Sequence, residues 1–186
     1  MSHKEIKIAG FGGQGVILAG GIIGKAVTIY DNKFATLTHS YGPEARGGAC
    51  SAQIIISDQK IAFPYVIHPD IIVLMSQEAY DKYAGEISEN GLLIVEKELV
   101  SVPEGIKQKV LSVPATRMAE DLGSRIVLNI VMLGFLTAVS GVVSGDGMKE
   151  SIKDTVPKGT EYMNNLAFER GLDYGKKICV ESTVKG

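Results

Sequence analysis

Cysteine and histidine are scarce in this chain, which has two cysteines and three histidines among its 186 residues. Cys50 and Cys179 lie far apart and form no C-x-x-C pair, and His3, His39 and His68 lack the spacing of metal ligands. An iron–sulfur cluster or a structural zinc ion needs several thiolates or imidazoles at short spacing. We therefore expect no metal and no cluster in this chain. Nothing indicates a disulfide framework, which favours a reducing, cytoplasmic compartment.

Net charge is also small, because 19 basic residues nearly balance 21 acidic ones. No global positive field therefore attracts nucleic acid or an anionic membrane, and we expect neither as a partner. The longest apolar stretch, residues 126–143, is interrupted by polar residues and glycines. A membrane span needs about 20 mostly apolar residues. The stretch therefore predicts a helix buried between layers, and no secretory apolar segment precedes the first predicted strand.

Apolar runs alternate with helical patterns along the chain, and 45% of the residues are hydrophobic, enough for one core. This β-α-β rhythm predicts a single α/β domain over residues 1–186, with a mostly parallel sheet, helices on both faces and a loose tail at 181–186. The predicted strands are residues 6–10, 33–38, 71–75, 92–95 and 109–113, and a β-hairpin of 51–57 with 60–63. The predicted helices are residues 15–29, 77–84 (capped by Ser76), 115–122, 125–140, 147–154 and 159–177.

A first glycine cluster, Gly12-Gly13-Gln14-Gly15, follows the first predicted strand and, with Gly10, satisfies G-x-G-x-x-G. Such a turn lets a backbone approach an anion at a helix N-terminus. A dinucleotide site also needs a carboxylate at the end of the second strand, where Thr38-His39 stands instead, which weakens that interpretation. Two alternatives stay open: the glycines only permit a tight turn, or they bind another phosphate-bearing ligand. Gln14 is a candidate to hydrogen-bond a ligand or a partner subunit.

A second cluster spans residues 40–48 and follows the second predicted strand, where ligands of open parallel sheets bind. Arg46 suits a phosphate or carboxylate, although Glu44 could simply pair with it and hold the loop. We predict no catalytic residue and no metal ligand. The binding candidates from both clusters are Gly12, Gly13, Gln14, Gly15, Ser40, Tyr41, Gly42, Glu44, Arg46, Gly47 and Gly48.

Residues 11–15 (F-G-G-Q-G) followed by residues 40–48 (S-Y-G-P-E-A-R-G-G) resemble the gamma subunit of 2-oxoacid:ferredoxin oxidoreductases, most nearly the 2-oxoglutarate type. His68-Pro69-Asp70, Asn90-Gly91, Pro114-Ala115-Thr116 and Asn129 agree with this resemblance, which covers residues 5–175.

The resemblance implies a three-layer α/β fold like domain III of pyruvate:ferredoxin oxidoreductase. It implies a subunit that is inactive alone and that works with alpha, beta and delta subunits and with ferredoxin, converting 2-oxoglutarate and coenzyme A to succinyl-CoA and CO2. Thiamine diphosphate, magnesium and iron–sulfur clusters belong to partner subunits, whereas coenzyme A would approach the glycine loops. Those loops could instead form a seam with a partner subunit, and the isolated chain could self-associate. A free-standing nucleotide-binding or regulatory module is the alternative from another class.

Overall fold

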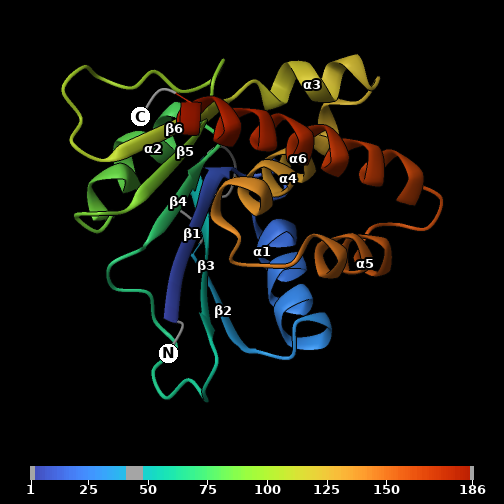
Figure 1. Cartoon of the computed structure of the whole chain (residues 1–186), viewed down its shortest axis with the longest axis horizontal. Coiled ribbons are helices and arrows are strands. Elements are labelled where there is room, and N and C mark those ends of the chain that lie inside the picture. Colours follow the sequence, from blue (N-terminus) through green and yellow to red (C-terminus); the bar gives the residue numbers. More distant parts are fainter. Residues whose placement is uncertain (1–2, 41–47, 185–186) are drawn as a thin grey trace.

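The computed structural model describes residues 3–40 and 48–184, with the side chains of 182–184 excepted. Within them the chain forms one mixed sheet with helices packed on it (Figure 1). The strands are β1 (His3–Phe11), β2 (Phe34–Ser40), β3 (Ala49–Ser57), β4 (Ile71–Leu74), β5 (Leu92–Glu96) and β6 (Lys109–Val113). The helices are α1 (Val16–Lys25), α2 (Gln77–Tyr83), α3 (Ala115–Asp121), α4 (Leu128–Ser140), α5 (Gly145–Thr155) and α6 (Glu161–Val184). Short helical turns are η1 (Ala26–Tyr30), η2 (Ala84–Glu86) and η3 (Arg125–Val127).

The strand order is β2-β3-β1-β4-β5-β6. The pairs β1–β4, β4–β5 and β5–β6 are parallel, whereas β3 pairs antiparallel with both β1 and β2. β3 is antiparallel to both β1 and β2, so β1 and β2 run in the same direction. Their carboxyl ends therefore lie at the same end of the sheet. The prediction of an α/β fold with a mostly parallel sheet is confirmed, with β3 as the antiparallel interruption.

The predicted hairpin of residues 51–57 with 60–63 is wrong, because residues 60–63 form no strand. Its first half is β3, which pairs along its length with β1 and β2. Ile54, Ile55 and Ile56 are all buried, so β3 is covered on both faces as a central strand is. Both hydrogen-bonding edges of β3 are occupied, which leaves none for the following segment.

Helices cover both faces of the sheet, as predicted. In β4, Ile71 and Val73 enter the larger core cluster, with α1, α4, α5 and α6. Ile72 and Leu74 enter a second cluster, with residues of α2. Successive strand residues point to opposite faces, so a continuous apolar run is what a strand buried on both faces requires.

The predicted buried helix is α4, whose residues from Leu128 to Thr137 are all buried. It crosses α6 at very short range: a Cβ on Gly134 would lie 2.0 Å from the Phe168 carbonyl oxygen, and one on Gly171 would lie 2.0 Å from that of Val131. Only glycine allows backbones to approach so closely. Among the described residues, no helix is long and apolar enough to cross a membrane.

The first and the last predicted helix end differently in the structure. The first helix ends its α-helical part at Lys25 and continues as the π-helical turn η1. The last helix, α6, runs to Val184. The prediction of a loose tail at 181–186 is therefore wrong for residues 181–184. No glycine or proline lies between Lys177 and Val184 to end the helix earlier.

Candidate functional site

Both glycine clusters adjoin the same end of the sheet, where β1, β2 and β4 finish and β3 starts. We call this end the strand rim: the last residues of β1, β2 and β4 and the first residues of β3. Ala49, directly after the second cluster, pairs with Phe11, directly before the first. At the other end of the second cluster, Ser40 closes β2 opposite Ser51. The structure therefore confirms that both clusters directly follow the carboxyl ends of strands, β1 and β2, at the same end of the sheet.

The first cluster forms a tight turn between β1 and α1. The Gln14 N–H donates to the Phe11 carbonyl (3.1 Å), and Gly13 and Gly15 have φ of 97° and 73°. That left-handed region favours glycine. A Cβ on Gly12 or Gly13 would meet nothing within 4 Å, so the outer side of the turn is open. The turn therefore presents bare backbone at the start of α1.

The Gln14 side chain spans two strand ends. Its Oε1 accepts from the Phe11 N–H (2.7 Å), and its Nε2 donates to the Met75 carbonyl (2.9 Å), just past β4. The amide expected to meet a ligand or partner thus ties the first turn to the neighbouring strand. Its direct contact with a ligand stays a prediction, whereas its bracing contacts are observed.

Asn129 braces the turn from α4. Its Nδ2 donates to the Gly15 carbonyl (3.2 Å) and its side chain is buried. A Cβ on Gly15 would lie 2.3 Å from the same Nδ2. Gly15 is therefore required both by its backbone conformation and by the approach of Asn129.

The second cluster is described only at its two ends, Ser40 and Gly48. The remaining candidates, Tyr41, Gly42, Glu44, Arg46 and Gly47, lie outside the described residues.

Glu78 of α2 holds the start of β3, directly after the second cluster. Its Oε1 accepts from the Ala49 N–H (3.1 Å). Ser76 caps α2 as predicted, because its Oγ accepts from the Ala79 N–H (3.2 Å). The capped helix thus positions Glu78 against the rim.

Glu96 is a buried carboxylate at the end of β5, and both of its oxygens accept hydrogen bonds. It accepts backbone N–H groups of Glu98 (2.7 Å), Leu99 (2.6 Å) and Thr116 (3.0 Å). These bonds anchor the turn after β5 and the start of α3, so Glu96 has a structural role.

Cys50 lies next to the rim, opposite Gly10. Burial raises the pKa of its thiol, so the thiol stays protonated at neutral pH and is a weak nucleophile. Among the described residues, no group of three or more His, Cys, Asp or Glu side chains could hold a metal ion.

Sequence reasoning missed the bracing roles of Glu78 and Glu96. The position of Glu78 in the first turn of a capped helix is a weak signal, because many exposed helices begin this way. Glu96 ends an otherwise apolar strand, which is a stronger signal for a buried, fully bonded carboxylate.

Comparisons with known proteins agree with this geometry. Residues 5–174 match the family described as pyruvate ferredoxin/flavodoxin oxidoreductase. The 2-oxoglutarate synthase subunit KorC of Methanocaldococcus jannaschii is 51% identical over 180 residues, which cover 95% of this chain and 96% of that protein. KorC of Methanothermobacter thermautotrophicus is 49% identical over 178 residues, covering 92% and 94%.

Two solved structures have the same fold. The gamma subunit of a keto/oxoacid ferredoxin oxidoreductase from Geobacter sulfurreducens superposes with a TM-score of 0.86 at 37% identity, covering 94% of this chain and 97% of that chain. A 2-oxoglutarate:ferredoxin oxidoreductase from Magnetococcus marinus, solved with 2-oxoglutarate, coenzyme A and succinyl-CoA, has a TM-score of 0.86 at 22% identity. The match covers 95% of this chain and 32% of the Magnetococcus chain. At 22% identity, this similarity shows a shared fold only.

The chain belongs to the pyruvate ferredoxin/flavodoxin oxidoreductase family. Within it, the resemblance to gamma subunits of the 2-oxoglutarate type is confirmed by relatives that match it over nearly their whole length.

Proposed function

We propose that this chain is the gamma subunit of a cytoplasmic 2-oxoglutarate:ferredoxin oxidoreductase, which converts 2-oxoglutarate, coenzyme A and oxidised ferredoxin to succinyl-CoA, CO2 and reduced ferredoxin. The observation that carries the proposal is 51% identity, over nearly the full length of both chains, with a 2-oxoglutarate synthase subunit. Alpha, beta and delta subunits would supply thiamine diphosphate, magnesium and the iron–sulfur clusters. This chain would orient groups and make no bond itself.

Within that complex, the strand rim would form part of the approach for coenzyme A. Gly12 and Gly13 leave open space, and the first N–H groups of α1 follow directly. Bare backbone at a helix N-terminus suits a phosphate, and Arg46 would add a charged, forked contact. Holding the thioester carrier in position lowers the entropic barrier to acyl transfer.

A seam with a partner subunit is the second candidate role for the rim. Phe11 and Leu18, on either side of the first glycine turn, are 39% and 38% exposed. Large apolar side chains at a surface favour contact with another protein. The two roles are compatible if coenzyme A passes along the seam.

The whole-complex role is tested by purifying a tagged copy of the chain from its native source. We expect thiamine- and cluster-bearing subunits to co-purify, and the complex to reduce ferredoxin only when 2-oxoglutarate and coenzyme A are both present. The isolated chain should show no turnover. A chain that purifies alone and is stabilised against heat by NAD, FAD or ATP would instead be the free-standing nucleotide-binding module.

The coenzyme A role is tested with Arg46→Gln in the assembled complex. A hydrogen bond to a charged group contributes about 1.5–3 kcal/mol, so the KM for coenzyme A should rise roughly tenfold or more. The KM for 2-oxoglutarate serves as the internal control and should not change. If the complex is intact and its KM for coenzyme A is unaltered, the coenzyme A role is wrong. Contact with a partner subunit would then be the remaining candidate role of the rim.

A further inference from the structure

Residues 75–78, which connect β4 to α2, contact both glycine clusters at the strand rim. The Met75 carbonyl accepts a hydrogen bond from the Gln14 side-chain amide of the first cluster (2.9 Å). Three residues later, Glu78 Oε1 accepts from the N–H of Ala49 (3.1 Å), the first residue of β3. One short segment therefore holds the first cluster through Gln14 and the described end of the second cluster through Ala49.

This connection is itself held on both faces of the sheet. The Met75 N–H donates to the Ala9 carbonyl of β1 (2.9 Å), and the Met75 side chain is fully buried. The Ser76 hydroxyl caps α2 by accepting from the Ala79 N–H (3.2 Å). Met75 packs into the core cluster that contains α1, whereas Ala79 packs into the cluster on the other face. The connection is therefore a fixed point against which the two clusters are set.

The bond between Ala49 and Glu78 joins a buried donor to an exposed acceptor. Ala49 is 2% exposed, so water does not readily replace the partner of its N–H group if that partner is lost. Glu78 lies on the exposed side of α2. Among the described residues, its carboxylate hydrogen-bonds to Ala49 alone. Any influence of Glu78 on the shape of the rim therefore passes through this one contact.

We propose that Glu78 is a positioning residue for coenzyme A, an inference that rests on the function proposed above for the rim. Through Ala49, Glu78 fixes the start of β3, and with it the described end of the second cluster. The same connection fixes Gln14, so the spacing between the two clusters depends on one segment. A carrier that contacts both clusters is held in a productive position only while that spacing is kept.

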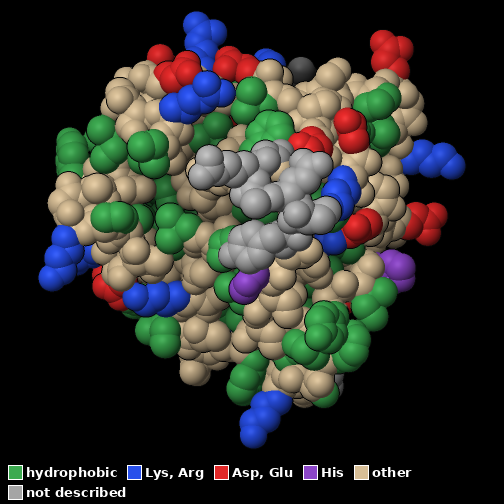
Figure 2. Space-filling view, turned by 180° about the vertical axis from the view of Figure 1, so that it is seen from behind, with side chains coloured by type: hydrophobic (Ala, Val, Ile, Leu, Met, Phe, Trp, Pro, Cys, Tyr) green, Lys and Arg blue, Asp and Glu red, His purple; other side chains and the backbone are tan. Residues whose placement is uncertain are grey.

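The charge of Glu78 does not account for such a role. Coenzyme A carries phosphates and is an anion, so a carboxylate near its path weakens binding by repulsion. Figure 2 shows acidic and basic side chains interspersed on the face seen from behind, so neither sign dominates there. The length of the Glu78 side chain and its hydrogen bond, rather than its charge, therefore carry the positioning role.

Two variants of Glu78 separate length from charge in the assembled complex. Glu78→Asp keeps the charge but is one methylene group shorter, so its carboxylate no longer meets the Ala49 N–H. Glu78→Gln keeps the length and an oxygen that accepts the same hydrogen bond, but has no charge. Glu78→Asp should raise the KM for coenzyme A roughly three- to tenfold, and Glu78→Gln should stay within about twofold of the parent.

The effect on KM distinguishes positioning from simple structural support. A loss of stability lowers the amount of active complex, and so the apparent kcat, without changing the KM for coenzyme A. The KM for 2-oxoglutarate should not change in either variant. Glu89→Asp is the matched control, because Glu89 is exposed in the turn before β5, at the opposite end of the sheet from the rim. It should keep the parent values.

Hydrogen exchange of the full-length chain, followed by NMR, reports on the contact without any catalysis. The Ala49 amide should exchange faster in Glu78→Asp than in Glu78→Gln or the parent. Equal exchange in all three would overturn the proposal, and this comparison decides if Glu78→Asp does not assemble into the complex.

The Arg46→Gln complex separates failure of this inference from failure of the proposed function. If Arg46→Gln raises the KM for coenzyme A and Glu78→Asp does not, Glu78 has no positioning role, and the proposed function stands. If neither variant changes that KM, the coenzyme A role of the rim is wrong and the positioning role is wrong with it. A rise of equal size in Glu78→Asp and Glu78→Gln would also contradict the proposal, because it would follow neither length nor hydrogen bonding.

Discussion

The side-chain amide of Gln14 donates to the carbonyl of Met75, 61 residues along the chain, at 2.9 Å. The same amide accepts from the Phe11 N–H, so one side chain joins the ends of β1 and β4. These two strands are parallel neighbours, and the bridge sits where the candidate site begins. The observed role of the glutamine in the G-G-Q-G turn is therefore structural: it holds the ends of β1 and β4 together at the rim.

Gln14→Ala should lower the free energy of unfolding by about 1–2 kcal/mol, because two hydrogen bonds are lost. Urea denaturation followed by circular dichroism measures this change. Gln59→Ala, at an exposed position, is the control and should change stability by less than about 0.5 kcal/mol. If Gln14→Ala is as stable as the unaltered chain, the brace contributes nothing to folding.

Alanine should destabilise the protein at Gly15 and leave its stability almost unchanged at Gly12. Gly15→Ala must adopt φ near 73° and displace the Asn129 amide, so it should cost about 2 kcal/mol or more. Gly12→Ala adds a methyl group into open space and should be within about 0.5 kcal/mol of the parent. Thermal unfolding of both variants checks the difference. In the complex, Gly12→Ala should still raise the KM for coenzyme A if phosphates pass over the turn.

The α4–α6 crossing should be intolerant of a methyl group. Gly134→Ala drives a Cβ into the Phe168 carbonyl, and such overpacking costs about 1–3 kcal/mol or more because the backbones must separate. Gly24→Ala, in α1, meets nothing and should instead stabilise by about 0.5–1 kcal/mol through helix propensity. Chemical denaturation of the two variants should therefore give shifts of opposite sign. A neutral Gly134→Ala would mean that the helices cross less closely.

The Tyr30–Asp154 hydrogen bond should be visible in pH titrations. Tyr30 Oη donates to Asp154 Oδ2 (2.5 Å), which raises the pKa of Tyr30 to about 12; this bond, with help from Lys25, lowers the pKa of Asp154. The stabilisation linked to Tyr30 is present below the ordinary tyrosine pKa of 10.0 and is lost as pH rises through about 12. The stabilisation linked to Asp154 is present above its unfolded pKa and is lost as pH falls through the lowered value.

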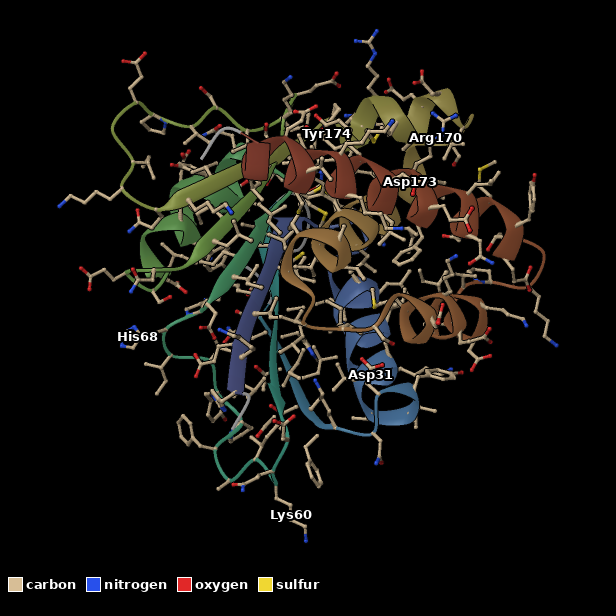
Figure 3. All side chains as sticks on the ribbon, viewed as in Figure 1. Asp31, Lys60, His68, Arg170, Asp173 and Tyr174 are labelled. Atoms are coloured by element: carbon tan, nitrogen blue, oxygen red, sulfur yellow. The ribbon has the colours of Figure 1, made fainter. Side chains whose placement is uncertain are left out.

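Asp154→Asn should move Tyr30 ionisation back toward its ordinary pKa. Ultraviolet difference absorbance of phenolate between the variant and the parent should show the extra ionisation at a lower pH. Asp173→Asn, on α6 and well separated from Asp31, the residue that follows Tyr30 in the chain (Figure 3), should leave the titration unchanged. An identical phenolate titration in Asp154→Asn and the parent would show that the pair does not form in solution.

Local sequence carried much of the fold. The strand at Ile71–Leu74, the capped start at Ser76 and the long apolar helix were all predictable, because each depends on residues a few positions apart. The hairpin prediction failed since the partner of a strand is chosen by the whole sheet. Figure 3 shows Lys60, in the segment predicted as a strand, on a loop at the end of the molecule near the N-terminus.

The candidate site divides in the same way. Its glycines were recognisable in sequence, because a turn with left-handed backbone at Gly13 and Gly15 requires glycine at those positions. Asn129 and Glu78 were not recognisable as braces, because their partners, Gly15 and Ala49, are 114 and 29 residues away. No spacing rule reports a hydrogen bond across such distances.

By itself, then, the amino-acid sequence determined the glycine turns, the alternation of strands and helices, and the family. Only the tertiary structure decided that β3 runs between β1 and β2, which brings the described ends of both glycine clusters to one rim and leaves β2 as the terminal strand of the described sheet. The physical reason is that turn conformation and amphipathic period are local properties of the chain. Strand partners and bracing contacts depend instead on which arrangement buries all the apolar faces and satisfies all the backbone groups at once.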